Sequence, residues 1–146
     1  MSYAIDLNIL LYASDSHSPR RAAATQFLRE ATERKDLLCI PYPVVLGYLR
    51  IATHPNILKN PLAPEEALQN IESLTTLPQA RLLSEREGFL DDYRNATAAL
   101  TARGNLVPDA HIATILRQHG VRLLYTSDRD FRRFEFLDVR DPFAND

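Results

Sequence analysis

Short apolar segments that alternate with helical segments constrain the fold of this chain more than any other feature of its sequence. Residues 2–5 predict a first strand, and residues 7–13, an apolar run too long to continue that strand, predict a first helix. Strands that alternate with helices indicate a parallel sheet covered by helices on both faces and joined by right-handed crossovers. A chain of 146 residues has the size of one domain, so we expect a single domain over residues 1–146.

Local signals place the other elements. Ser18, followed by a proline, predicts the start of a second helix that ends near Arg34, because Ser caps helices well and Pro suits the first helical position. Ser84 and Glu87 match a capping box and predict a helix that continues to about Arg103. The further expected strands are residues 37–40, 80–83, 122–126 and 135–139, and the further expected helices are residues 44–53, 64–77 and 108–119.

Charge and cysteine content limit the kinds of partner and the cellular location that we expect for the protein. The net charge of −2 lacks the basic character of many nucleic-acid-binding proteins, although basic groups can still gather locally. The single cysteine, Cys39, cannot form an internal disulfide, so a cytoplasmic location is expected. No apolar run reaches the roughly 20 residues of a membrane-spanning helix. Asp6 interrupts the N-terminal apolar segment, so we expect neither a signal peptide nor membrane association.

Three aspartates stand where open α/β sheets place their chemistry, at the ends of strands and the starts of helices. Asp6 follows the first strand, Asp128 follows the strand of residues 122–126, and Asp109 lies in the first turn of a helix. Each has an ordinary structural explanation, as a helix cap, a turn residue or an acid favoured by the helix dipole. Together they indicate more, because the C-terminal ends of parallel strands meet along one edge of the sheet.

Carboxylates that gather in one place repel one another, and a divalent cation relieves that repulsion. Oxygen ligands suit a hard ion such as Mg²⁺ or Mn²⁺, which can hold a phosphodiester, activate a water molecule and stabilise the leaving oxygen. Other chemistries also use acidic α/β edges, but two of them do not match. A phosphatase of the haloacid dehalogenase type needs a second acid where this chain has Asn8. A receiver domain needs a late lysine, and the only lysines are Lys35 and Lys59.

Three segments together resemble the PIN-domain ribonucleases, and specifically the VapC-type toxins of bacterial toxin–antitoxin pairs. They are AIDLNIL at residues 4–10, VPDAHIA at residues 107–113 and TSDRDF at residues 126–131. A fourth segment, LGYLRIATHP at residues 46–55, also looks like a subgroup of the VapC-type toxins. The similarity extends over essentially the whole chain, and the order and spacing of the motifs make it specific.

The resemblance implies a PIN-like α/β/α sandwich with a central, mainly parallel sheet of four to five strands. It implies an endoribonuclease that depends on Mg²⁺ or Mn²⁺, is the toxin of a type II toxin–antitoxin pair, and cleaves RNA phosphodiester bonds with metal-activated water. The implied protein partners are a second copy of the chain, as a homodimer, and a VapB-type antitoxin whose tail enters the acidic groove.

The same resemblance assigns roles to individual residues. Asp6, Asp109 and Asp128 are the expected catalytic residues and metal ligands, and Asn8 is expected to orient them through hydrogen bonds. Asp130 either supports this centre or only caps the turn that follows it. The other expected supporting residues are Thr126 and Ser127, through their hydroxyl groups, and Arg50, for which an ion pair within the structure is favoured over binding of a substrate phosphate.

One position departs from the family pattern. Many PIN-domain nucleases carry a glutamate on the helix after the second strand, at the place where the register of Arg50 puts Gly47 in this chain. Residues 37–54 contain no acid at all. We therefore expect a centre of three aspartates, supported by Asp130 or by no further acid, that holds one ion rather than two. A helper acid from elsewhere in the chain, such as Asp91 or Asp92, stays open as an alternative. The missing acid also supports an alternative, a PIN-like domain with weak or no catalysis that acts by binding RNA or protein.

Overall fold

A computed structural model describes residues 1–144, and its centre is one sheet of five parallel strands. Every pair of neighbouring strands is parallel, which confirms the expected α/β fold with a parallel sheet. The strands lie in the spatial order β3-β2-β1-β4-β5. Their bounds are β1 Ser2–Ile5, β2 Leu37–Pro41, β3 Ala80–Leu83, β4 Leu123–Tyr125 and β5 Asp138–Arg140.

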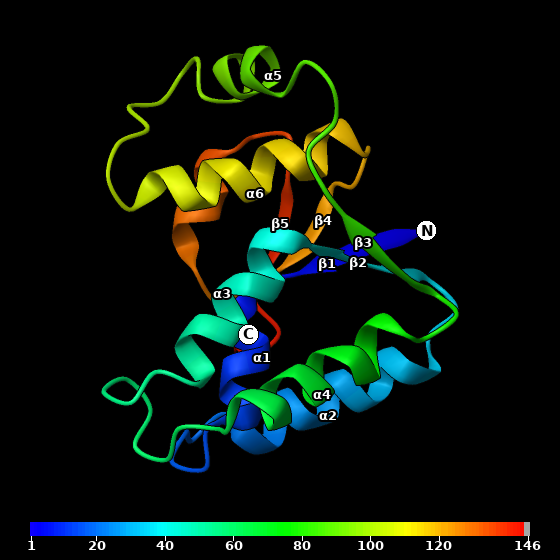
Figure 1. Cartoon of the computed structure of the whole chain (residues 1–146). Coiled ribbons are helices and arrows are strands. Elements are labelled where there is room, and N and C mark those ends of the chain that lie inside the picture. The colour runs from blue at the N-terminus through cyan, green and yellow to red at the C-terminus, as the bar shows by residue number, and fades with distance from the viewer. Residues whose placement is uncertain (145–146) are drawn as a thin grey trace.

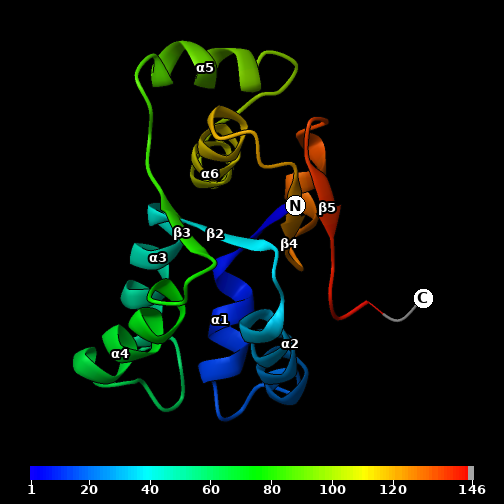
Figure 2. The same ribbon diagram turned by 90° about the vertical axis from the view of Figure 1, so that its right-hand side faces the viewer.

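Helices cover both sides of the sheet. Figures 1 and 2 show α5 and α6 on one side and α1, α2 and α4 on the other, while α3 packs against α1, α4 and α6. This arrangement is the sandwich that alternating strands and helices predict. The helices are α1 Leu7–Ser14, α2 Arg21–Glu33, α3 Tyr42–Ala52, α4 Pro64–Thr75, α5 Phe89–Ala96 and α6 Leu106–Gln118, with a 3₁₀ helix, η1, at Arg129–Arg133.

The core lies around the central strands, which are covered on both faces and therefore read as continuous apolar runs. Residues Tyr3, Ala4 and Ile5 of β1 are fully buried, as is Leu124 of the neighbouring β4. The helix α6 buries more of its residues than any other described helix, seven of its 13 residues. This packing fixes the two strands that carry the acids against the helix that carries the third.

The direction of the strand order reverses between β1 and β4. From β1 the chain moves outward through β2 to β3, and it then returns to place β4 and β5 on the other side of β1. In open α/β sheets, the crevice at the C-terminal ends of two strands that flank such a reversal is where ligands bind. Asp6 directly follows β1 and Asp128 lies three residues after the end of β4. The topology therefore directs attention to these two acids before their contacts are considered.

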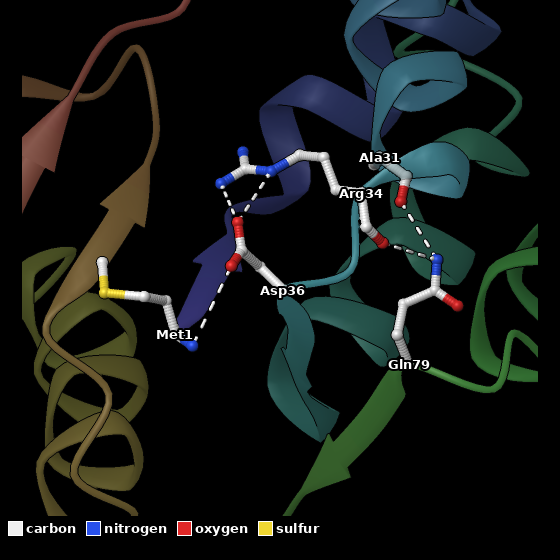
Figure 3. Close-up of polar contacts among 5 residues, drawn as sticks. All are labelled: Met1, Ala31, Arg34, Asp36 and Gln79. Carbon is white, nitrogen blue, oxygen red and sulfur yellow. Dashed lines mark hydrogen bonds and ion pairs between the residues drawn. The ribbon is translucent and has the colours of Figure 1, made fainter.

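A group of polar contacts ties together the opposite, N-terminal end of the sheet (Figure 3). Arg34, just after α2, pairs with Asp36 through Nη2 at 2.8 Å, and the other Asp36 oxygen lies 3.9 Å from the amino group of Met1. The Arg34 guanidinium also stacks over the ring of Tyr3, 4.1 Å from its centre. The amide of Gln79 donates to the carbonyls of Ala31, Thr32 and Arg34 at the C-terminal end of α2.

The helix predicted from the capping box was wrong in both bounds. It was expected from Ser84 to about Arg103, but α5 covers only Phe89–Ala96. Tertiary contacts hold this segment in another conformation, because the Ser84 carbonyl accepts a hydrogen bond from His119 and the Glu85 carboxylate pairs with His111 of α6. Such tertiary partners override a local capping signal. Gly88, in the left-handed region at φ 79°, makes the turn into the helix.

The bounds of α6 and of the last strand also differ from the expectation. The helix α6 begins at Leu106 rather than Pro108, and Pro108 is tolerated because the first turn of a helix leaves its N–H groups unpaired in any case. The last strand covers Asp138–Arg140 rather than residues 135–139, because Leu137 is used in a turn onto the carbonyl of Phe134.

In the part of the chain that the structure describes, we find no helix with the length and apolar character needed to cross a membrane.

Candidate metal centre

Asp6 is the most deeply buried acid at the edge where the strand order reverses between β1 and β4, with only 5% of its surface exposed. It caps α1, because its Oδ1 accepts the N–H of Leu7 at 2.7 Å. Its other oxygen, Oδ2, accepts the hydroxyl of Thr126 at 2.8 Å and lies 3.5 Å from the amide nitrogen of Asn8. The helix-cap role foreseen for Asp6 therefore exists, and it leaves the carboxylate fixed at the edge between β1 and β4.

Thr126 connects the two acids that follow the central strands. Its hydroxyl donates to Asp6 and accepts the N–H of Asp128 at 3.0 Å and the amide of Asn8 at 3.1 Å. These three contacts use its one hydrogen and both of its lone pairs. Thr126 is itself 1% exposed, so this arrangement is held within the core. Thr126 and Asn8, for which the sequence predicts a supporting role, both form hydrogen bonds to Asp6.

A second group of acids lies beside Asp6. One carboxylate oxygen from each of Asp109, Asp128 and Asp130 lies within 4.8 Å of the others, close enough to bind one ion together. Asp128 also caps η1, because its Oδ1 accepts the N–H of Asp130 at 2.9 Å. The structure thus brings together the expected Asp109 and Asp128, and it places Asp130 with them. Asp6 does not belong to this compact group among the described residues.

The pKa values of two acids report how strongly the centre disfavours negative charge. Burial raises the pKa of Asp109 from 3.8 to about 7, and the charges of Asp128, Asp6 and Asp130 add to the rise. Burial also raises the pKa of Asp6 from 3.8 to about 6, although the hydrogen bonds from Thr126 and Leu7 oppose this effect. A divalent cation would reverse the balance by favouring the ionised carboxylates, so the donor set fits Mg²⁺ or Mn²⁺.

The amide of Asn8 gives a separate sign of a missing partner. Its nitrogen must face Thr126, because the Thr126 hydrogen is already donated to Asp6, and this fixes the orientation of the amide. The opposite atom, Oδ1, is buried and accepts no hydrogen bond from the described residues. A buried acceptor without a donor is costly. A water molecule of a hydrated cation would satisfy Asn8 Oδ1, which supports the same fit.

Two residues of α3 do not join the acidic group. A Cβ atom on Gly47 would lie 2.9 Å from Cδ2 of Leu7, so the Leu7 side chain occupies the space that a larger residue at this position would need. Arg50 is exposed, and it forms no ion pair with an acid of residues 1–144. The favoured interpretation of Arg50 as a paired residue was therefore wrong. Arg50 projects away from the core face of α3, because that face carries Tyr48 and Ala52.

Ser127 lies next to Asp128 and leads to a residue that the sequence did not single out. Its hydroxyl is 3.2 Å from the hydroxyl of Tyr12, which comes from α1. Tyr12 follows Asn8 by four residues, so the two side chains lie on one face of the helix. That spacing was the available signal for Tyr12. Its contact with Ser127 adds α1 to the elements that position the loop carrying Asp128.

Comparison with known proteins decides which family this geometry belongs to. The model of the PIN domain matches residues 3–137. Ribonuclease VapC48 of Mycobacterium tuberculosis is 42% identical over 144 residues, which is 99% of this chain and 99% of that protein. The chain belongs to the VapC-type ribonucleases of the PIN-domain family. Another VapC-type ribonuclease, VapC33 of the same organism, is 28% identical over 94% of this chain and 95% of its own.

Solved structures show that the VapC-type fold is shared at low sequence identity. VapBC2 from Rickettsia felis, bound to a DNA fragment from its promoter, superimposes with a TM-score of 0.69 at 16% identity and covers 97% of this chain and 98% of that one. The toxin VapC20 of Mycobacterium tuberculosis, described as cleaving the sarcin-ricin loop, gives a TM-score of 0.68 at 14% identity over 95% and 99% of the two chains. The expected PIN-like fold is therefore confirmed, as is the membership in the VapC-type ribonuclease toxins.

Proposed function

We propose that this VapC-type ribonuclease is an endonuclease that hydrolyses RNA phosphodiester bonds with Mg²⁺ or Mn²⁺ at the centre formed by Asp6, Asp109, Asp128 and Asp130. The observation that carries the proposal is the approach of three carboxylate oxygens to within 4.8 Å of one another, beside a fourth buried carboxylate. Such a group is unfavourable without a cation, as the raised pKa values of Asp6 and Asp109 indicate.

The position of each aspartate indicates its role in binding the ion. Asp109 and Asp128 face each other from α6 and the loop after β4 and would hold the ion directly, with Asp130 as a third ligand or as a hydrogen-bond acceptor for bound water. Asp6 would complete the ligand set from β1. The bound ion supplies a polarised phosphoryl oxygen and a water of lowered pKa for attack on phosphorus.

Thr126 and Asn8 would fix the orientation of this ligand set. The Thr126 hydroxyl holds the Asp6 carboxylate at 2.8 Å, and the free Oδ1 of Asn8 would accept a hydrogen bond from water. Supporting hydrogen bonds of this kind orient ligands and affect metal affinity by roughly 10- to 100-fold. We propose that the centre binds one ion rather than two, since Gly47 supplies no acid and Leu7 fills the adjacent space.

The first test is RNA cleavage by the purified protein with Mg²⁺, with Mn²⁺ and with EDTA. Asp6→Asn and Asp128→Asn variants are expected to lose cleavage, and Asp138→Asn is the matched control because this exposed acid pairs with Arg140 on β5, outside the centre. Undiminished cleavage by both site variants would reject the centre. RNA binding by the wild type without cleavage under any divalent ion would instead favour a domain that only binds RNA. The missing acid at Gly47 is the observation that supports this alternative.

We also propose that a VapB-type antitoxin controls the activity. A cleft of about 490 Å³ is lined by residues of α1, α2, α3 and α4. Its apolar lining includes Leu10, Leu28 and Leu74, and its charged lining residues are Arg21, Arg29 and Glu66. An amphipathic antitoxin segment with acidic residues beside its apolar face fits this combination. Co-purification with the product of a short reading frame upstream of the gene is the test, and Leu28→Glu is expected to weaken the complex.

A homodimer remains part of the proposal. The exposed face of α3 carries two large apolar side chains, Tyr42 at 46% and Leu46 at 61% exposure, and Val107 at the start of α6 is 41% exposed. The helices α3 and α6 are in contact, so these residues lie on adjoining elements. Exposed apolar side chains on neighbouring elements are typical of a protein interface. Sedimentation velocity of the chain without antitoxin would measure the oligomeric state.

A further inference from the structure

Arg20 is a cation held in place by two aromatic rings and not by an acid. Its guanidinium carbon lies 5.3 Å from the centre of the Tyr12 ring and 5.5 Å from the centre of the Phe143 ring. Its Nη1 donates to the Tyr12 hydroxyl at 3.3 Å. Within residues 1–144, Arg20 takes part in no ion pair. The charge of this exposed arginine is therefore fixed in position and still available to a ligand.

A short chain of hydrogen bonds connects Arg20 with the metal centre. The Tyr12 hydroxyl that accepts from Arg20 also lies 3.2 Å from the Ser127 hydroxyl, and Ser127 directly precedes Asp128. Ser127 further lines a small cavity of about 70 Å³ together with Arg129 and Arg132. Arginine side chains from two parts of the chain therefore lie around the loop that carries Asp128. Asp141 is the acid that also lines this cavity.

The C-terminal segment contributes the second ring of this arrangement. The carboxylate of Asp141 accepts the N–H of Phe143 at 2.9 Å, which turns the chain after β5 back on itself. The rings of Tyr12 and Phe143 then meet edge to face, with their centres 5.6 Å apart. Figure 2 shows the segment after β5 descending on the side of the sheet where α1 and α2 lie. Arg20, which directly precedes α2, therefore contacts one ring from α1 and one from the C-terminal segment while it stays exposed.

Physical chemistry favours a phosphate as the ligand of Arg20. A group of four aspartates repels the RNA backbone, and a fixed cation linked to it through Tyr12 and Ser127 offsets that repulsion for the part of the substrate that lies outside the ion's reach. The arginine fork binds phosphate through two parallel hydrogen bonds. Stacking on Tyr12 and Phe143 already restricts the side chain, so little further freedom is lost on binding.

We propose that Arg20 binds a backbone phosphate of the RNA substrate next to the scissile one, and that Tyr12 and Phe143 position its guanidinium for this contact. The proposal rests on the proposed ribonuclease function, because it places the contact on the substrate of the same centre. It gives Arg20 a role in binding the substrate and leaves the hydrolysis to the acidic residues.

The test measures the affinity of a short single-stranded RNA of mixed sequence in EDTA, at several salt concentrations, for the wild type, Arg20→Ala and Arg20→Lys. The matched control is Arg117→Ala, since Arg117 also stacks on an aromatic ring, 5.1 Å from the centre of Phe136, but lies in the last turn of α6, opposite to Asp109. Arg20→Ala is expected to weaken binding roughly 10-fold, as for loss of a hydrogen bond to a charged group. Its salt slope should fall by about 0.7, the value for one phosphate on a single strand.

The outcomes separate this contact from a structural role and from the proposed function. A structural role would lower the melting temperature of Arg20→Ala and Arg117→Ala alike and leave the salt slopes equal, and that result overturns the proposal. If Arg20→Ala is too unstable to purify, a wild-type affinity in Arg20→Lys overturns the proposal equally, because lysine keeps the charge and the salt slope but loses the fork. If the wild type cleaves RNA in Mg²⁺ but Arg20→Ala has the RNA affinity and salt slope of the wild type, only the proposed contact of Arg20 is refuted. If the salt slope of RNA binding falls in Arg20→Ala but the wild type cleaves no RNA with any divalent ion, only the proposed hydrolysis is refuted.

Discussion

Raising the pH should destabilise the metal-free protein, because two aspartates of the metal centre hold their protons more tightly in the folded chain. Burial, joined by neighbouring carboxylates, raises the pKa of Asp6 from 3.8 to about 6 and that of Asp109 from 3.8 to about 7. In the unfolded chain both carboxyls ionise near their ordinary pKa. The stability that they contribute is therefore complete below about pH 4, and it is lost as the pH rises through about 6 and 7.

The size of the effect follows from these two pKa values. Asp6 is only 5% exposed, so its full rise counts, and it corresponds to about 3 kcal/mol at about 1.4 kcal/mol per pKa unit. About half of that is lost between about pH 5 and about pH 8, because part is lost already below this interval. Asp109 is partly exposed, so screening by solvent reduces its share to about 1 kcal/mol. The free energy of unfolding should thus fall by about 2–3 kcal/mol over the interval.

Urea unfolding in EDTA at the two pH values measures this fall. The double variant Asp6→Asn/Asp109→Asn should lose most of the pH dependence, whereas Asp91→Asn, at an exposed acid of α5 paired with Arg94, should keep it. Adding Mg²⁺ to the wild type should restore stability more at the higher pH, because the ion binds the ionised carboxylates. Equal unfolding free energies at both pH values, or a dependence that persists in the double variant, would refute the reasoning.

Three further predictions concern the proposed dimer interface, the number of bound ions and the N-terminal end of the sheet. Leu46→Glu should yield a monomer by sedimentation velocity, with the unfolding free energy within about 0.5 kcal/mol of the wild type because Leu46 is 61% exposed; an unchanged dimer contradicts the proposed interface. Leu7→Ala/Gly47→Glu should bind two Mn²⁺ ions by calorimetry where the wild type binds one, since the truncated Leu7 clears the space beside position 47. Arg34→Ala should cost about 1–2 kcal/mol in urea unfolding, through loss of its ion pair with Asp36 and its stacking on Tyr3, and Arg34→Lys should recover only part of it.

The sequence predicted those features that depend on pattern and topology. Residues 2–5 and 37–40 were recognised as strands because buried parallel strands are continuous apolar runs. Asp6 and Asp128 were placed at one edge because all parallel strands end there. This inference needed neither the strand order nor the side-chain geometry, and the observed reversal between β1 and β4 makes it stronger.

What the sequence did not predict depends on contacts between distant residues. The capping box at Ser84 is locally sound, but His119 and His111 of α6 engage the Ser84 carbonyl and the Glu85 carboxylate. Arg50 looked internal because its helix is apolar, although its position on the face opposite to Tyr48 directs it to solvent. Tyr12 and Arg20 both belong to segments that read as ordinary helices. Only the return of the C-terminal segment onto α1 reveals why they matter.

The geometry of the centre is set by strand register more than by any local motif. Ile5 of β1 pairs with Tyr125 of β4, so the next residues, Asp6 and Thr126, also lie side by side. The backbone continues this pairing one step past the strand, because the Asp6 N–H donates to the Tyr125 carbonyl at 3.0 Å. The Thr126 hydroxyl can then reach both Asp6 and the N–H of Asp128. A shift of one residue between β1 and β4 would break the contact between Thr126 and Asp6, so the requirement for a metal centre and the requirement for a packed sheet coincide at this edge.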